Sequence, residues 1–300
     1  MTGSSGFLGQ RLCKRLSEEG HAVFEVPSKV CDLTKEADVC SKLPRDGKFD
    51  MIYHLAAWTR AGDFSLTHPG EQWVKNQQMN TNVLSWWKDC QPQAKMVTIG
   101  TSCSYDPQFE LKEENYMKGT PVDSLFTYAM TKRMLYAGLL SLNKQYGLKY
   151  VCFVPSALYG PTYHTDGRQM QFIFDLARKI VRGKKFNERV VLWGDGYQRR
   201  EIVHIDDFVA AMIALSSREN EIVNIGTGAE STIREFAGII CNKVGYDQNK
   251  IEYDTSRYVG AKSKCLDTGK MQQLLPGFKS TPMDVGIGQM VEWFVEREKA

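Results

Sequence analysis

The sequence lacks the signatures of several protein classes. Its eight cysteines form no Cys-x-x-Cys pair and no His-Glu-x-x-His pattern occurs, which argues against a zinc site. No apolar run approaches the roughly 18 residues that a membrane-spanning helix needs. Internal repeats and low-complexity tracts are absent, and a net charge of +3 is too small to indicate a nucleic-acid-binding protein. What remains is an ordinary globular composition, with 24% charged and 42% hydrophobic residues.

The cysteines instead indicate free thiols. Cys152, for example, stands in the apolar run Tyr-Val-Cys-Phe-Val, where a buried thiol is the ordinary interpretation. No signal-peptide pattern is present at the start of the sequence. We therefore expect a cytoplasmic protein.

Apolar strand-like segments alternate with helical segments in the first half of the chain. Strands are predicted at residues 22–26, 51–55, 95–99 and 150–154, and helices at about 72–90 and 125–146. This alternation predicts an α/β fold with a doubly wound parallel sheet of the Rossmann type. Since the regular alternation of strands and helices ends near Gly160-Pro161, we predict a smaller α/β substrate-binding domain after this point.

Two domains are expected. Residues 1–160 plus about 203–225 are predicted to form the dinucleotide-binding domain. The ranges of about 161–202 and 226–300 are predicted to form the domain that binds the substrate.

A glycine-rich turn opens the chain and is followed by a helical pattern. Glycines spaced three apart at a helix start allow backbone N–H groups to approach a pyrophosphate. The candidate cofactor contacts in this turn are Gly3, Ser5, Gly6, Phe7, Leu8 and Gly9. Only Met1 and Thr2 precede the turn, so we expect the central first strand to be truncated by about five to eight residues, judged from ordinary strand lengths.

Tyr128 and Lys132 are spaced one helical turn apart in the predicted helix at 125–146. A lysine in that position can lower the pKa of the phenol. A tyrosine tuned in this way can exchange a proton with a sugar oxygen while hydride moves at carbon. The spacing alone is a weak signal, because most such pairs are solvated.

In combination with other motifs, the chain resembles the extended short-chain dehydrogenase/reductase family, which acts on nucleotide-activated sugars. The matching pieces, in order, are the glycine turn, Asp32-Leu33, Leu55-Ala-Ala57, Asn76, Asn82, Thr101-Ser-Cys-Ser-Tyr105, Tyr128-x-x-x-Lys132, residues 155–161 and residues 200–207. Within the family, the chain is most similar to epimerase/reductases of GDP-4-keto-6-deoxy sugars. The resemblance implies NADPH-dependent reduction of a 4-keto nucleotide sugar, with or without epimerisation at carbons 3 and 5.

The resemblance implies four catalytic residues. Thr101 stands where the family has its catalytic hydroxyl, and a threonine keeps that hydroxyl. Tyr128 would protonate the nascent oxyanion, and Lys132 would hold the nicotinamide ribose. Cys103 matches the acid/base cysteine of the epimerase/reductases, and its alternative role is that of a buried thiol beside the loop.

The expected partner of Cys103 is missing. Where the epimerase/reductases have a histidine, gap-free counting reaches Gln171, which cannot titrate. His164, in the same segment, is either a substitute or a surface-loop histidine. Reduction is therefore better supported than epimerisation.

The end of the predicted second strand bears on the choice of cofactor. NAD-preferring relatives carry an acidic residue there for the ribose hydroxyls. Ser28 and Lys29 instead suit a 2′-phosphate, so we predict NADPH rather than NAD. Asp32 is expected at the adenine edge. The further cofactor contacts that the resemblance implies are Leu33, Leu55, Ala56, Ala57, Lys132, Pro155 and Leu158.

The positions matching the family's substrate site are Lys179, Trp193, Arg200 and Asp267. Arginine offers a planar fork to phosphate oxygens, and lysine offers a point charge. Trp193 either stacks on the base or fills core. No metal is expected.

A homodimer is expected from the resemblance, because relatives often dimerise through the Tyr–Lys helix. Met130, Met134, Leu135 and Leu139 would supply its apolar face, and the same residues could equally be core. Two other functions stay open: an NAD-retaining nucleotide-sugar 4-epimerase or dehydratase, and a non-catalytic dinucleotide-binding regulator.

Overall fold

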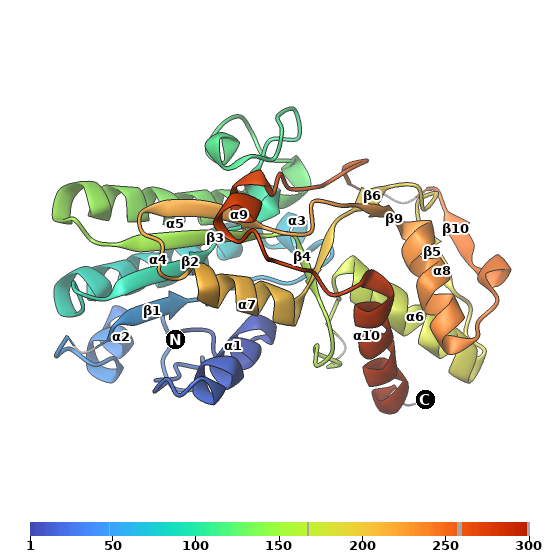
Figure 1. The fold of residues 1–300 in the computed structure, drawn as a ribbon, viewed down its shortest axis with the longest axis horizontal. Coiled ribbons are helices and arrows are strands. Elements are labelled where there is room, and N and C mark those ends of the chain that lie inside the picture. Colours follow the sequence, from blue (N-terminus) through green and yellow to red (C-terminus); the bar gives the residue numbers. More distant parts are fainter. Residues whose placement is uncertain (48, 167, 257–259, 299–300) are drawn as a thin grey trace.

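The computed structural model describes residues 1–47, 49–166, 168–256 and 260–298. Figure 1 shows a larger lobe built around a sheet and a smaller lobe that contains α6, α8 and α10. The N-terminus lies beside the sheet of the larger lobe. None of the helices in these ranges has both the length and the apolar character to cross a membrane.

A four-stranded parallel sheet forms the centre of the larger lobe, in the order β1-β2-β3-β8. Its strands are β1 (Met51–His54), β2 (Lys95–Ile99), β3 (Tyr150–Pro155) and β8 (Glu221–Ile225). The apolar segments predicted at 51–55, 95–99 and 150–154 are therefore strands. The predicted doubly wound α/β fold is confirmed.

Helices cover both faces of this sheet. On one face, α4 (Pro69–Cys90) and α5 (Phe126–Tyr146) pack Trp87 and Leu139 against Met96. On the other, α1 (Phe7–Glu18) and α7 (Ile205–Leu215) pack against Val97. Because successive side chains of a strand point to opposite faces, Met96 and Val97 enter different cores. Both faces are thus apolar, as a parallel sheet requires.

The predicted strand at residues 22–26 is wrong. Only Val26 of that segment pairs, through a single parallel bridge with Thr2, and Phe24 is 42% exposed. Thr2 also bridges to His54, so it stands in the sheet between the two. The backbone N–H of Val26 donates to the carbonyl of Met1 at 2.8 Å, and residues 22–25 form no bridge of their own.

The smaller lobe has its own core. Phe174, Phe236 and Phe294 join α6 (Phe172–Phe186), α8 (Ile233–Val244) and α10 (Met283–Arg297) in one cluster of buried side chains. Three short two-stranded sheets accompany it: β4 (Ala157–Tyr159) with β7 (Ile202–His204), β5 (Val191–Trp193) with β10 (Glu252–Asp254), and β6 (Arg199–Arg200) with β9 (Ser231–Thr232). The remaining helices are α2 (Glu36–Lys42), α3 (Phe64–Thr67), α9 (Gly269–Leu274) and the 3₁₀ turns η1 (Ser102–Ser104), η2 (Glu113–Asn115), η3 (Asp123–Leu125) and η4 (Gln248–Lys250).

The proposed domain boundaries stay a prediction. One part of the range 226–300 differs from the rest: α9 packs beside β8, and its Met271 is buried in the core that α1 and α7 share with the sheet. The chain after α8 thus returns to the larger lobe, and α10 then completes the smaller lobe.

Candidate active site

The loop after β2 places two of the predicted catalytic residues side by side. Thr101 caps the 3₁₀ turn η1, and its hydroxyl accepts a hydrogen bond of 3.2 Å from the backbone N–H of Cys103. Thr101 is buried and Cys103 is half-buried. Both lie beyond the carboxyl end of a central parallel strand, where ligands of doubly wound sheets bind.

Tyr128 reaches the same place from the first turn of α5. Its phenol lies close enough to Thr101 and Cys103 for both side chains to act on its pKa. Burial raises the pKa of Tyr128 above its ordinary value, the negative charge of Cys103 adds to this, and the Thr101 side chain opposes it. The structure therefore differs from the expectation that Lys132 lowers this pKa, because Cys103 and Thr101 are the groups that act on the phenol.

Lys132 is buried one turn further along α5, with 6% of its surface exposed. Burial lowers the pKa of its ammonium to about 8. Within the described part of the chain, no residue hydrogen-bonds this ammonium. A buried ammonium without such a partner is rare and is suited to holding a ligand hydroxyl.

Cys103 has a partner that the sequence did not indicate. The Nζ of Lys264 donates a hydrogen bond of 2.9 Å to its Sγ. Burial raises the pKa of Cys103, but the charge of Lys264, hydrogen bonds from Lys264 and Thr101, and the charge of Arg200 together lower it below the ordinary value. Lys264 lies in an irregular segment, so no periodicity or motif could have singled it out.

Neither candidate for the missing histidine meets Cys103. Gln171 is exposed, and it is the N-cap residue of α6. The imidazole of His164 tilts against the ring of Tyr163 and lies 3.4 Å from Asp166. Burial lowers the pKa of His164, and the charges that act on it belong to neighbours in its own lobe.

The glycine turn is packed too tightly for larger residues. Gly3 has a φ of +68°, and a Cβ there would lie 2.8 Å from the backbone nitrogen of Ala56. A Cβ on Gly9 would lie 2.1 Å from the carbonyl oxygen of Gly3. Gly6 is the N-cap of α1, so the positive end of the helix dipole faces the turn. This cradle, together with the buried ammonium of Lys132, fits a nicotinamide dinucleotide.

The other predicted residues of the turn have distinct surroundings. Ser5 is exposed, and its carbonyl accepts a hydrogen bond from Gln10. Phe7 packs edge-on against Tyr163 at 5.2 Å between ring centres, which joins the turn to the smaller lobe. Leu8 packs against the core that α1 and α7 share with the sheet.

Further from the turn, Lys29 is exposed. The carboxylate of Asp32 accepts a hydrogen bond of 2.7 Å from the Thr34 hydroxyl, which lowers its pKa. The remaining predicted cofactor contacts stand near the sheet edge, with Leu33 buried and Leu55, Ala56, Ala57, Pro155 and Leu158 half-buried.

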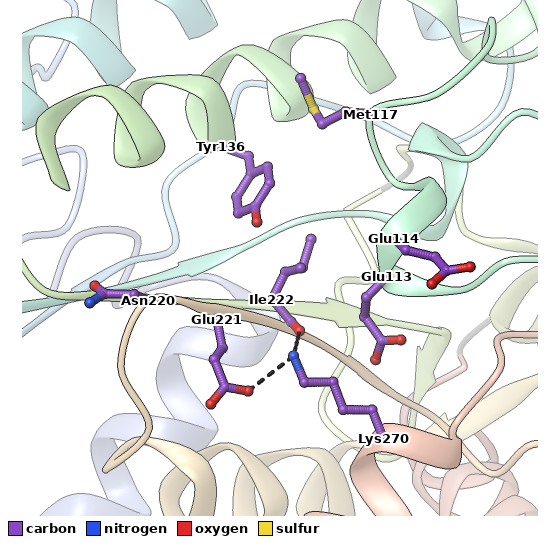
Figure 2. A pocket seen from close by; sticks show the side chains of 8 residues that line it. All are labelled: Glu113, Glu114, Met117, Tyr136, Asn220, Glu221, Ile222 and Lys270. Atoms are coloured by element: carbon purple, nitrogen blue, oxygen red, sulfur yellow. Dashed lines mark hydrogen bonds and ion pairs between the residues drawn. The ribbon is translucent and has the colours of Figure 1, made fainter. Parts of the chain in front are cut away.

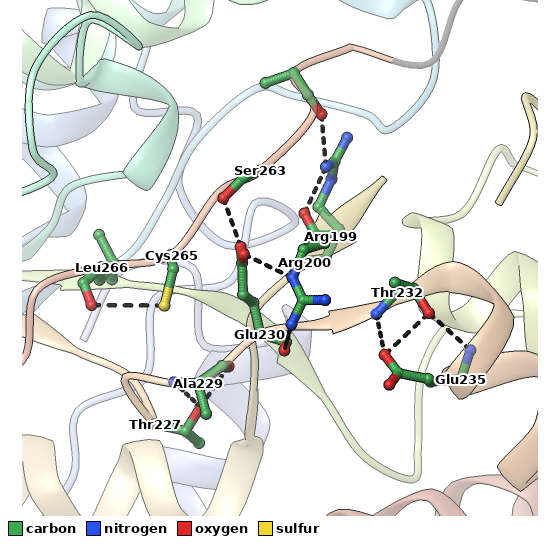
Figure 3. Close-up of polar contacts among 11 residues, drawn as sticks. Arg199, Arg200, Thr227, Ala229, Glu230, Thr232, Glu235, Ser263, Cys265 and Leu266 are labelled. Carbon is green, nitrogen blue, oxygen red and sulfur yellow. Dashed lines mark hydrogen bonds and ion pairs between the residues drawn. The ribbon is translucent and has the colours of Figure 1, made fainter. Parts of the chain in front are cut away.

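Of the predicted substrate residues, Arg200 is the one whose charge acts on Cys103. Its guanidinium donates to the carbonyls of Arg199 and Ala261, at 2.7 and 2.8 Å. Figure 3 shows how β6 and the segment at 261–266 are joined here, with Arg199 and Ser263 both directed to Glu230.

The other three predicted substrate residues stand on different elements. Trp193, at the end of β5, is 51% exposed. Lys179 on α6 forms an ion pair of 2.8 Å with Asp175. The carboxylate of Asp267 accepts a hydrogen bond from the backbone of Gly269 at the start of α9.

A surface hollow of about 410 Å³ lies away from this site. Figure 2 shows Lys270 there, bonded to the carbonyl of Ile222 and to Glu221, both on the edge strand β8. None of the predicted site residues lines it. Among the described residues, no group of His, Cys, Asp or Glu side chains could hold a metal ion.

A doubly wound sheet, a tight glycine turn and a tyrosine beside a buried lysine and a buried hydroxyl define the class of nicotinamide-dinucleotide-dependent oxidoreductases. The chain belongs to the NAD dependent epimerase/dehydratase family, which it matches over residues 1–226. The family recognised from the sequence is thereby confirmed. NAD(P) is accordingly the cofactor expected for this chain.

Among curated proteins, the chain is 29% identical over 310 residues to probable GDP-L-fucose synthase 1 of Oryza sativa subsp. japonica, covering 99% of this chain and 91% of that protein. It is 25% identical over 314 residues to the GDP-L-fucose synthase of Escherichia coli strain K12, covering 99% and 96%. Identity to the GDP-L-colitose synthase of Yersinia pseudotuberculosis is also 25%, over 306 residues that cover 99% and 98%.

Solved structures share the fold. A GDP-L-fucose synthetase from Naegleria fowleri superposes with a TM-score of 0.84 at 22% identity, covering 99% of this chain and 92% of that one. A structure of the same enzyme bound to NADP gives a TM-score of 0.83 at 23% identity, covering 98% and 92%.

Proposed function

We propose that this protein uses NADPH to reduce a 4-keto or 4-keto-6-deoxy nucleotide sugar, GDP-linked as in GDP-L-fucose synthases. The observation that carries the proposal is the convergence of the Thr101 hydroxyl and the Tyr128 phenol, with the buried ammonium of Lys132 one turn further along α5. Such an arrangement concentrates donors at the point where a carbonyl oxygen gains charge.

Each residue then has a defined task. When bound, the reduced nicotinamide supplies hydride to the carbonyl carbon. Tyr128 gives its proton to the oxygen, and its raised pKa keeps the phenol protonated and available as an acid near neutral pH. Thr101 donates a hydrogen bond to the same oxygen. Lys132 holds the hydroxyls of the nicotinamide ribose.

Support for a GDP sugar comes from the names of the relatives and from the smaller lobe. The curated relatives from rice, Escherichia coli and Yersinia are all named as synthases of GDP sugars. Trp193, which is 51% exposed, is of the side-chain type on which bases stack. Arg200 would bind the diphosphate beside Cys103.

Epimerisation before reduction is the second candidate, favoured by one observation. The pKa of Cys103 lies below its ordinary value, and a thiolate is the form that can take a proton from carbon. An NAD-retaining 4-epimerase or dehydratase is the alternative within the family. A non-catalytic regulator would have no use for the Tyr–Lys pair.

We also propose a cytoplasmic homodimer. All eight cysteines are free, which suits a reducing compartment. Leu135 and Leu139 are core residues, which removes them from the predicted dimer face, whereas Met134 is 37% exposed and Met130 is half-buried. A dimer through α5 would therefore use the side of the helix that carries Met134.

The test is NADPH oxidation with GDP-, dTDP- and UDP-linked 4-keto sugars, followed by NMR of each product. Turnover with the GDP sugar and a reduced carbon 4 are expected, and inversion at carbons 3 and 5 would establish the epimerase/reductase. Copurified NAD without net NADPH consumption would instead favour the NAD-retaining alternative.

A further inference from the structure

The contact between Cys103 and Lys264 joins two segments far apart in the sequence. Cys103 belongs to the loop after β2, and Lys264 belongs to the segment at 261–266 that precedes α9. Their side chains meet at 2.9 Å, with the ammonium donating to the sulfur. A cation at this distance stabilises a thiolate directly.

We propose that Lys264 is the charge partner of Cys103: it holds the thiol as a thiolate base for proton exchange beside the substrate ketone, in place of a histidine. This inference rests on the proposed function, because it needs a 4-keto sugar whose neighbouring carbon can lose a proton. Lys264 acts through the sulfur and is therefore a positioning residue.

The backbone fixes Lys264 in place. The N–H groups of Arg199 and Glu201 donate to the carbonyls of Lys262 and Lys264, at 2.7 and 3.2 Å. The buried carboxylate of Glu201 accepts the N–H of Leu266 at 2.8 Å. These bonds tie the segment to β6 on both sides of the lysine, so the ammonium is held against the sulfur by an ordered backbone.

Among the described residues, the groups that act on the sulfur come from several elements. Lys264 and Arg200 contribute positive charge, Thr101 lies beside it in the same loop, and Tyr128 contributes a half-buried phenol that is protonated near neutral pH. The net field therefore favours the thiolate. By contrast, the structure raises the pKa of five other thiols through burial: Cys13, Cys31, Cys152, Cys241 and Cys265.

The proton-exchange step balances without another reactant. The thiolate takes a proton from the carbon beside the ketone, so a C–H bond breaks and an S–H bond forms. The electron pair moves onto the ketone oxygen, where Thr101 and Tyr128 stabilise the enolate. The reverse step returns the proton to carbon and restores the thiolate beside Lys264.

The test measures how fast iodoacetamide alkylates Cys103 across a range of pH. The tryptic peptide 96–112 contains no other cysteine, so mass spectrometry follows this thiol alone. We expect the alkylation rate to show its inflection at a pH below the pKa of about 8.5 that an ordinary thiol has. In Lys264→Met the inflection should move upward and the rate near neutral pH should fall roughly tenfold.

Two variants complete the alkylation test. Lys264→Arg restores the positive charge and should return the inflection toward the wild-type pH. Lys262→Met removes a charge from an exposed side chain two residues away and should change nothing. An unchanged inflection in Lys264→Met would overturn the proposal. The proposal would also be overturned if the alkylation rate of the wild-type protein inflected at or above the pH found for a free thiol. That measurement does not depend on whether any variant folds.

Hydrogen exchange into the substrate tests whether Cys103 and Lys264 together act as a base. With a GDP-4-keto-6-deoxy sugar in D₂O and no reduced cofactor, NMR should show deuterium entering beside the ketone, more slowly in Lys264→Met. Absence of exchange with the wild type would overturn the role as a base. A failure of the proposed reduction would be recognised separately. NADPH would not be oxidised, whereas the pH dependence of Cys103 alkylation would be as expected.

Discussion

At the scale of single residues, the buried Lys132 destabilises the folded protein, and its presence is better explained by a role in function. Lys132 is buried on α5, and burial lowers the pKa of its ammonium to about 8. The unfolded chain keeps the pKa near 10.5, so the folded state carries an electrostatic penalty below the folded pKa. Residues that work against folding in this way are typical of active sites.

Lys132→Met should therefore stabilise the protein and abolish turnover. We expect the free energy of unfolding to rise by about 1–3 kcal/mol near pH 7, because methionine keeps the volume and removes the buried charge. The stability advantage of the variant should shrink as pH rises from about 8 toward 10.5. In this range the ammonium of the folded wild-type protein loses its proton, whereas that of the unfolded chain keeps it. Urea unfolding across this range measures it, and a loss of stability at every pH would contradict the account.

Lys29 is the residue on which the predicted preference for NADPH depends. It is exposed beyond Val26, where NAD-preferring relatives carry an acid. Lys29→Glu should weaken NADPH binding roughly tenfold and leave NADH binding nearly unchanged, because only the 2′-phosphate is repelled. Fluorescence titration with both cofactors measures this ratio. The same substitution at Lys144, near the far end of α5, is the control, and equal losses for both cofactors would refute the assignment.

At the scale of elements, the sequence predicted those segments whose patterns are local. The apolar run at 95–99 coincides with β2, and the predicted helix at 125–146 differs from α5 by one residue at its start. The segment at 22–26 failed because a strand also needs a pairing partner, and within the described residues the segment forms a single bridge, between Val26 and Thr2. Lys264 was missed for a related reason: its role depends on a tertiary contact with no local pattern.

The start of α1 offers a test at this scale. A methyl group on Gly9 would lie 2.1 Å from the carbonyl oxygen of Gly3, so Gly9→Ala should force α1 away from the turn. We expect a loss of about 1–3 kcal/mol in the free energy of unfolding, together with much weaker NADPH binding.

The control for this substitution lies in α4. A Cβ on Gly70 would meet nothing within 4 Å, and Gly70→Ala should be neutral or stabilise the protein by up to about 1 kcal/mol. Thermal unfolding with and without NADPH measures both variants. Wild-type stability and cofactor affinity in Gly9→Ala would show that the turn tolerates a side chain.

At the scale of the whole molecule, the site is assembled from segments that the chain order separates. The loop after β2 supplies Thr101 and Cys103, α5 supplies Tyr128 and Lys132, and the segment before α9 adds Lys264. The chain crosses from the smaller lobe back to the sheet at this segment (Figure 1). The proposed substrate chemistry would thereby take place where both lobes contribute side chains.

The most direct test of this account is Tyr128→Phe, which removes one hydroxyl and keeps the ring. NADPH binding should remain at the wild-type level by fluorescence titration, because Lys132 and the glycine turn are untouched. Oxidation of NADPH in the presence of a GDP-4-keto-6-deoxy sugar should fall at least about 100-fold, since the proton donor is lost. Full turnover in this variant would contradict the central claim that Tyr128 delivers the proton during carbonyl reduction.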